Sequence, residues 1–126
     1  MDKRFNSGFI KNNNYKLVSA KDGCAVMEAE IDETSLNPFM NAHGGYIYGL
    51  ADTVAGAAAY SNGRPAVTLS GTMEYLHTIR GKKLRAEAIC IKDGRNTSNY
   101  EVSIYDIERD RVAAKALFTY FYIEEK

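Results

Sequence analysis

The chain has 126 residues, which is enough for one domain with a core of modest size and too few for two. Its 16 Lys and Arg residues balance 16 Asp and Glu residues, so the formal net charge at pH 7 is zero. Such a chain has no overall field that attracts nucleic acid or an anionic membrane surface, and no apolar run in the sequence could span a bilayer. We therefore expect a single domain, residues 1–126, with neither nucleic acid nor a membrane as partner.

The first residues and the two cysteines both favour a cytoplasmic location. Residues 1–8 lack the apolar run of a signal peptide. Cys24 and Cys90 have no CxxC spacing and no cluster of histidines beside them, which is typical of free thiols packed inside a protein of a reducing compartment. The sequence therefore predicts a cytoplasmic protein without a disulfide.

The first third of the chain reads as a lead-in followed by two strands. Residues 1–14 are rich in Asn and poor in apolar side chains, which predicts a loose or short helical lead-in. Two strands follow at 15–20 and 25–32, and the Asp-Gly pair at 22–23 favours a hairpin turn between them. Residues 33–42 then form a loop that leads into a helix.

Residues 45–61 are the one segment with both the length and the composition of a helix. Gly63 marks its end, because glycine adopts the left-handed conformation that terminates helices. One side carries large apolar residues, such as Ile47, Leu50 and Val54, at the spacing of a face that packs on a sheet. The opposite stripe consists of Gly45, Tyr48, Gly49, Asp52, Ala55, Gly56 and Ala59.

The stripe around Asp52 is unusual, because a solvated helix face normally carries Lys and Glu. Its single carboxylate lies among residues with almost no side chain, so we expect Asp52 to be enclosed. Each glycine inside a helix costs roughly 1 kcal/mol relative to alanine, so the glycines predict close approach by another backbone or by a ligand. The alternative is an Asp that simply reaches water.

The tripeptide His43-Gly44-Gly45 places backbone N–H groups without bulky side chains at the positive end of the helix dipole. Such N–H groups suit an anion or the oxyanion of a reacting carbonyl. The alternative is a tight turn before the helix, with His43 in a structural role.

Four more strands are predicted after the helix. They span residues 66–76, 83–92, 99–106 and 111–123, with turns at Arg80-Gly81, Asp93-Gly94 and Glu108-Arg109-Asp110. This order predicts an α+β domain whose mostly antiparallel sheet curls around a single helix. One helix cannot cover so wide a sheet, and the uncovered edge predicts a homodimer, alone or as a dimer of dimers.

One motif carries a family resemblance. Asn37, the tripeptide at 43–45 and Leu50-Ala51-Asp52 together resemble the motif of hotdog-fold acyl-CoA thioesterases of the phenylacetate-pathway (PaaI-like) group. In element order the similarity covers about residues 15–123. It implies one hotdog thioesterase-like domain, in which a mostly antiparallel sheet wraps around one long central helix.

The resemblance also implies roles for individual residues. Asp52 would be the base or nucleophile, the N–H of Gly44 would bind the thioester carbonyl, Asn37 and His43 would position substrate and water, and Thr68 would supply a hydroxyl after the helix. Further substrate contacts are expected at Gly45, Tyr48, Gly94 and Arg95. The chain departs from the family pattern at Met40, where a glycine is common, and at 76–79, where a proline is common.

The chemistry of thioester hydrolysis fits these residues independently of the family resemblance. It needs a donor for the tetrahedral oxyanion and a base or nucleophile, which Gly44 and Asp52 can provide. A serine triad is not expected, because no Gly-x-Ser-x-Gly occurs, nor is a metal site, since His43 and His77 are the only histidines. We expect an acyl-CoA hydrolase without a cofactor, coenzyme A being part of the substrate. A hotdog hydratase or dehydratase and a non-catalytic acyl-CoA sensor are the alternatives.

The spacing of Gly44 and Asp52 predicts a site shared between two chains. Eight helical residues separate them by about 12 Å along the axis, whereas both groups must lie about 3 Å from one reacting carbonyl. A two-fold dimer with antiparallel helices would bring Gly44 of one subunit beside Asp52 of the other.

Overall fold

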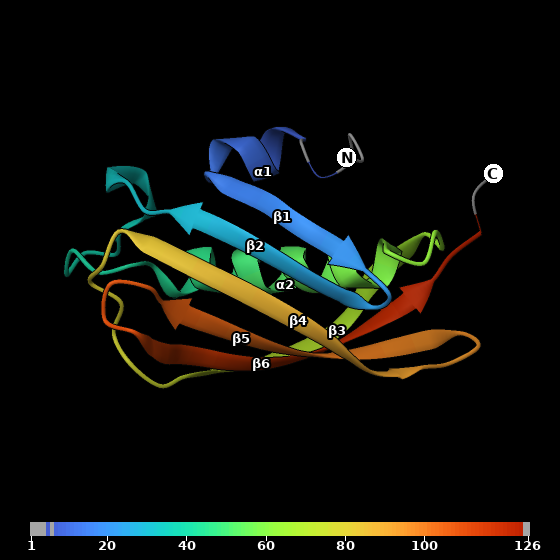
Figure 1. The fold of residues 1–126 in the computed structure, drawn as a ribbon. Helices are drawn as coiled ribbons and strands as arrows, with labels where there is room; N and C mark the ends of the chain where they lie inside the picture. Colours follow the sequence, from blue (N-terminus) through green and yellow to red (C-terminus); the bar gives the residue numbers. More distant parts are fainter. Residues whose placement is uncertain (1–4, 6, 125–126) are drawn as a thin grey trace.

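The computed structural model describes residue 5 and residues 7–124. Within these residues, six strands form one sheet and a single long helix lies against it (Figure 1). The elements are α1 (Gly8–Asn12), β1 (Tyr15–Lys21), β2 (Cys24–Glu30), the short 3₁₀ helix η2 (Glu33–Ser35), α2 (Gly44–Tyr60), β3 (Ala66–Tyr75), β4 (Lys83–Asp93), β5 (Thr97–Asp106) and β6 (Arg111–Tyr122). Of the predicted lead-in, residues 1–4 and 6 lie outside the described part of the chain, and the rest contains α1.

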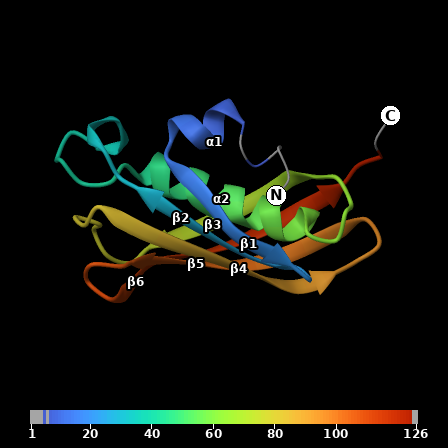
Figure 2. The ribbon, with the colours of Figure 1, turned by 45° about the horizontal axis from the view of Figure 1, so that its top comes forward.

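The strand order is β1-β2-β4-β5-β6-β3, and every neighbouring pair is antiparallel. Figures 1 and 2 show α2 running along the inner side of the curved sheet. The chain leaves β2, passes through α2 and returns as β3 on the far edge, beside β6. The predicted α+β architecture, an antiparallel sheet wrapped around one helix, is confirmed, and β3 keeps one edge without a partner strand in the described chain.

The helix ends as its sequence predicts, with Gly63 in the left-handed region at a φ of +82°. Its packing face is wider than predicted, however. Ile47, Leu50 and Val54 are buried, but Ala55 and Ala59 from the opposite stripe are fully buried too. The curved sheet therefore packs against small residues on the flanks of the stripe as well.

The helix glycines are approached by groups that the sequence prediction did not name. A Cβ added at Gly49 would lie 2.7 Å from the Tyr15 hydroxyl, and one added at Gly56 would lie 3.0 Å from the Tyr120 hydroxyl. The prediction of close approach is therefore correct, but the approaching groups at these two positions are tyrosine side chains of the same chain. Another backbone or a ligand is not needed to explain either glycine.

The two cysteines are free thiols, yet only one of them is packed as predicted. Cys90 is half-buried, whereas Cys24 is exposed. The reason is strand alternation, because Ala25 and Met27 turn toward the core and leave Cys24 on the outer face. None of the helices in the described residues is long and apolar enough to cross a membrane. The same residues contain no group of three His, Cys, Asp or Glu side chains that could hold a metal ion.

Candidate active site

Asp52 lies half-buried in the middle of α2, where side chains from two strands converge on it. Its Oδ1 accepts a hydrogen bond of 2.7 Å from the Thr68 hydroxyl on β3. The Tyr120 hydroxyl on β6 lies 2.6 Å from the same Oδ1 and also 2.6 Å from the backbone oxygen of Asp52. One carboxylate oxygen is therefore held by two hydroxyl donors.

The sheet register explains why these two hydroxyls meet. Thr68 and Tyr120 are directly paired across β3 and β6, just before a register shift between Thr68 and Ser70. Side chains at directly opposed positions point to the same face of a sheet. That face is the one against α2, so both hydroxyls reach the helix at the level of Asp52.

The state of the Tyr120 hydroxyl follows from its surroundings. Burial raises the pKa of Tyr120 well above its usual range, and the nearby Asp52 carboxylate raises this pKa further. The phenol therefore stays protonated at physiological pH and acts as a donor. Asp52 Oδ2 has no hydrogen-bond partner within the described part of the chain, and it is not fully buried.

A cavity of about 610 Å³ opens beside this carboxylate. Asp52, Thr68 and Tyr120 supply polar groups on one of its sides. Phe5, Tyr60, Val67 and Ile123 are among the residues that make the remainder largely apolar. The arrangement offers an available carboxylate oxygen at the border of a space that suits an apolar group.

The start of α2 forms a second, separate site. His43 caps the helix, and its Nδ1 accepts the N–H of Gly45 at 2.8 Å. The Gly45 N–H was expected to contact substrate, but in this structure it donates to His43 of the same chain. The N–H of Gly44 has no acceptor among the described residues. Since Nδ1 accepts a hydrogen bond, the neutral His43 ring carries its proton on Nε2.

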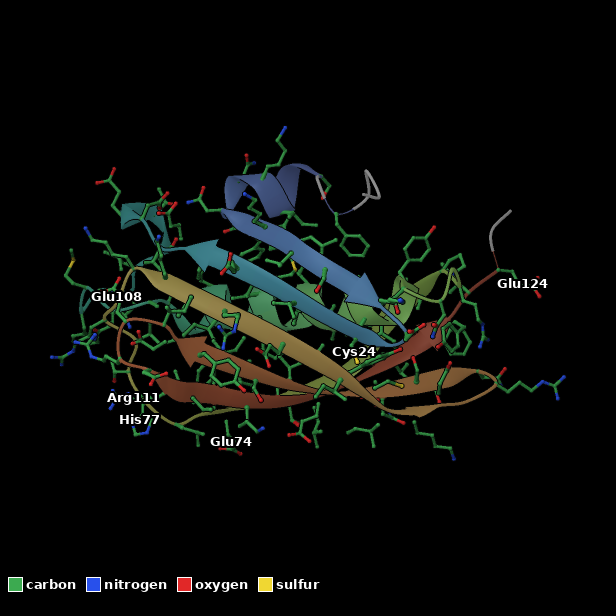
Figure 3. The ribbon with its side chains drawn as sticks, in the orientation of Figure 1. Cys24, Glu74, His77, Glu108, Arg111 and Glu124 are labelled. Carbon is green, nitrogen blue, oxygen red and sulfur yellow. The ribbon has the colours of Figure 1, made fainter. Side chains whose placement is uncertain are left out.

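Gly44 is not required by the packing of this chain. A Cβ added there would lie 3.6 Å from the Tyr75 ring, which is ordinary contact, and its φ is not in the left-handed region. The Tyr75 hydroxyl instead donates to the Gly44 carbonyl at 2.8 Å. A cavity of about 440 Å³ lies in front of Gly44, and Asn37, Tyr75 and His77 are among its lining residues. In Figure 3, His77 lies at one end of the sheet and Glu124 at the other.

Asn37 shapes the loop that borders this second cavity. Its Oδ1 accepts the backbone N–H groups of Phe39, at 2.9 Å, and Asn41, at 3.1 Å. The side-chain amide N–H groups remain as donors beside Gly44. Within the same turn Met40 has a φ of +65°, a conformation that favours glycine. Met40 thus has a glycine-like backbone conformation at the position where the resemblance led us to expect a glycine.

The remaining residues predicted to contact substrate lie elsewhere. The Tyr48 ring packs against Phe118, with 5.3 Å between ring centroids, and Tyr48 lines neither of the two cavities described above. Gly94 and Arg95 form the turn between β4 and β5. Their carbonyls accept hydrogen bonds from Arg64, which ties this turn to the segment after α2.

Four of the predicted catalytic residues therefore fall into two groups that one chain does not bring together. Asp52 and Thr68 share one cavity, and Asn37 and Gly44 share the other. Because Gly44 and Asp52 belong to one unbroken helix, about 12 Å separates them along its axis.

Tyr120 is the residue at the site that the sequence prediction missed. No functional role was predicted for it from the sequence, and it is buried in the structure. Strand alternation could have placed it on the inner face, as for Phe118 and Tyr122. Its contact with Asp52 depends on the register of β6 against β3, for which the sequence carries no local signal.

Comparison with known proteins agrees with the fold and with the motif. The family model of the Thioesterase superfamily matches residues 39–113, which is more than half of the chain. This match includes Gly44, Asp52 and Thr68.

Individual relatives point to the same group. The chain is 31% identical over 98 residues to acyl-coenzyme A thioesterase PaaI of Escherichia coli K12, covering 77% of this chain and 70% of that protein. The structure of the E. coli PaaI protein superposes with a TM-score of 0.91 at 25% identity, over 98% of this chain and 89% of that one. The smu.793 protein of Streptococcus mutans UA159, solved bound to acetyl-CoA, gives a TM-score of 0.83 at 33% identity, over 90% and 91% of the two chains. The chain therefore belongs to the thioesterase superfamily and, within it, to the PaaI-like group of hotdog-fold thioester hydrolases.

Proposed function

We propose that this protein hydrolyses a small-molecule acyl-CoA thioester to a free acid and coenzyme A, with Asp52 as base or nucleophile. The observation that carries the proposal is the Asp52 carboxylate, which has one oxygen held by two hydroxyls and the other available beside an apolar cavity. Acetyl-CoA binding by the similar S. mutans protein supports an acyl-CoA as substrate. The two free cysteines fit the expected cytoplasmic location.

The proposed reaction uses one water molecule and no cofactor. Asp52, acting as a base, takes a proton from water while the oxygen of that water attacks the thioester carbonyl carbon. The Gly44 N–H, at the positive end of α2, stabilises the resulting oxyanion, and the side-chain amide of Asn37 adds a second donor. The carbon–sulfur bond then breaks, and the CoA thiolate takes up the proton. The acyl group occupies the cavity beside Asp52.

We infer that a second copy of the chain supplies the missing half of each site. β3 follows α2 in the opposite direction, because Thr68 near its start meets Asp52 and Tyr75 at its end meets Gly44. β3 is an edge strand, and its apolar side chains Val67 and Leu69 are 47% and 61% exposed.

Antiparallel pairing of two β3 edges about a two-fold axis would place the Gly44 end of one chain beside the Asp52 end of the other. This route replaces a direct contact between the two antiparallel helices, because tyrosine hydroxyls of the same chain fill the space beside Gly49 and Gly56. Two equivalent sites per dimer follow from the symmetry.

The proposal is tested by incubating the purified protein with CoA thioesters from acetyl to aromatic and measuring released thiol. We expect turnover of at least one of them. Binding of acyl-CoA without thiol release would instead identify a sensor. Loss of enoyl-CoA absorbance without thiol release would identify a hydratase, which needs an acid and a base acting on substrate carbons.

A further inference from the structure

We propose that Tyr120 is a positioning residue that fixes the Asp52 carboxylate for hydrolysis, and that Gly56 is a glycine because it makes room for the Tyr120 hydroxyl. The inference rests on the proposed thioesterase function. It assigns a role to a side chain that lies 68 residues from Asp52 in the sequence.

The first step of the argument is the geometry of the two donors. An isolated Asp carboxylate rotates broadly about its last torsion angle, so either oxygen can face a substrate. Here Thr68 and Tyr120 bind the same oxygen, at 2.7 Å and 2.6 Å, from two adjacent strands. With Oδ1 held from both strands, the rotation is restricted and Oδ2 is the oxygen left to act on water or carbonyl.

The second step concerns the anchoring of Tyr120 itself. Its side chain is 5% exposed, and its ring makes an edge contact with Tyr100 at 6.0 Å between centroids. The hydroxyl also lies 2.6 Å from the Asp52 carbonyl oxygen. Its single proton can serve only one acceptor at a time, and an ionised carboxylate is the stronger acceptor. The hydroxyl is therefore a fixed donor beside the helix backbone.

The third step explains Gly56, which lies one helical turn after Asp52. A Cβ at this position would come within 3.0 Å of the Tyr120 hydroxyl and 3.5 Å of its ring. A methyl group here would push the Tyr120 hydroxyl away by a few tenths of an ångström and so weaken its bond to Asp52. This local need accounts for a glycine that otherwise costs helix stability.

A matched pair elsewhere in the helix separates this role from simple packing. The Tyr15 hydroxyl occupies the space beside Gly49 in the same manner, and it donates to the Tyr46 carbonyl at 2.5 Å. Tyr15 is as buried as Tyr120 but makes no hydrogen bond to Asp52. Tyr15→Phe therefore removes an equivalent buried hydroxyl without touching the proposed site.

The test compares thiol-release kinetics of Tyr120→Phe, Tyr15→Phe, Gly56→Ala and the Gly56→Ala, Tyr120→Phe double variant. Losing a hydrogen bond to a charged group predicts a kcat roughly 10- to 100-fold lower for Tyr120→Phe. KM should change less than about twofold, because the hydroxyl acts through Asp52 rather than on substrate. Tyr15→Phe should keep the wild-type kcat.

The double variant gives the most specific readout. Gly56→Ala should lower kcat in the wild-type background but have little further effect when the Tyr120 hydroxyl is already absent, because the methyl then fills the vacated space. Near-UV circular dichroism checks that each variant folds. An active wild type with unchanged kcat in Tyr120→Phe, additive losses in the double variant, or a raised KM at constant kcat would each overturn the positioning role. A wild type that hydrolyses no thioester would instead reject the proposed function, and the inference with it.

Discussion

The two halves of the proposed site, in the middle of α2 and at its start, are built from different groups. Around Asp52 of α2, hydroxyls from β3 and β6 both donate to its carboxylate, so the half-site is assembled by one chain. At Gly44 the useful group is a backbone N–H, and it has no acceptor among the described residues. The first half offers a held carboxylate and the second an unused donor. Each has what the other lacks, which is the reason to expect that they meet between chains.

Replacing Asp52 with Asn should have the largest effect on turnover. The amide keeps the size of the carboxylate but cannot accept a proton from water or attack a carbonyl. Removal of a general base predicts a loss of roughly 10²- to 10⁴-fold in kcat, with acyl-CoA binding retained. Thiol-release assays measure kcat, and a binding isotherm measures acyl-CoA affinity separately. Wild-type rates in Asp52→Asn would remove the carboxylate from the mechanism.

Gly44→Val tests the other half of the comparison. The branched side chain would crowd the cavity in front of the N–H, and an oxyanion donor that the substrate cannot reach predicts a decrease of roughly 10²- to 10³-fold in kcat. Gly44→Ala is the control, since its Cβ would sit at ordinary contact distance from Tyr75 and leaves the N–H accessible. His43→Ala should be milder than Gly44→Val. If Gly44→Val were silent with every good substrate, the two glycines would be only a turn before the helix.

The sequence predicted the fold more completely than the site, because the two depend on signals of different range. Strand alternation and Asp-Gly turns are local, and they placed the strands and α2 to within a few residues of their observed ends. Asn37, Gly44 and Asp52 stand within sixteen consecutive positions that carry the family motif. Tyr120 could not be found in this way, because its contact with Asp52 depends on the pairing of β3 with β6.

The helix glycines show the same limit. The sequence indicated that something approaches Gly49 and Gly56 closely, but only the three-dimensional packing identifies the Tyr15 and Tyr120 hydroxyls. The exposure of Cys24 was missed because cysteine spacing alone does not indicate which face of a strand a residue occupies. The alternation of β2 places Cys24 on the outer face, away from the buried Ala25 and Met27.

Complementation asks whether the two halves meet between chains. Inactive Asp52→Asn and Gly44→Val chains are unfolded and refolded together in equal amounts. Random pairing makes about half of the dimers mixed, and each mixed dimer has one intact and one doubly altered site, so about a quarter of wild-type activity should return. Refolding each variant alone is the control. Mixed dimers without activity would mean that both groups act within one chain.

The smallest expected effect concerns the acyl group rather than the catalytic groups. Phe5 and Tyr60, whose ring centroids are 6.2 Å apart, line both the cavity beside Asp52 and a neighbouring cavity of about 370 Å³. Phe5→Ala should join the two spaces and admit longer acyl chains. Each additional buried methylene contributes about 0.8 kcal/mol, so the kcat/KM ratio of a longer to a shorter acyl-CoA should rise several-fold.

The control for this variant is Phe9→Ala, which removes an exposed ring of the same N-terminal region that lines neither cavity. It should leave the chain-length profile unchanged. The measurement is kcat/KM for a series of straight-chain acyl-CoA substrates. If Phe5→Ala left the chain-length profile unchanged and raised KM for every substrate, the pantetheine arm of coenzyme A would occupy this cavity instead of the acyl group. A contact with the arm is common to all substrates, whereas a contact with the acyl group depends on its length.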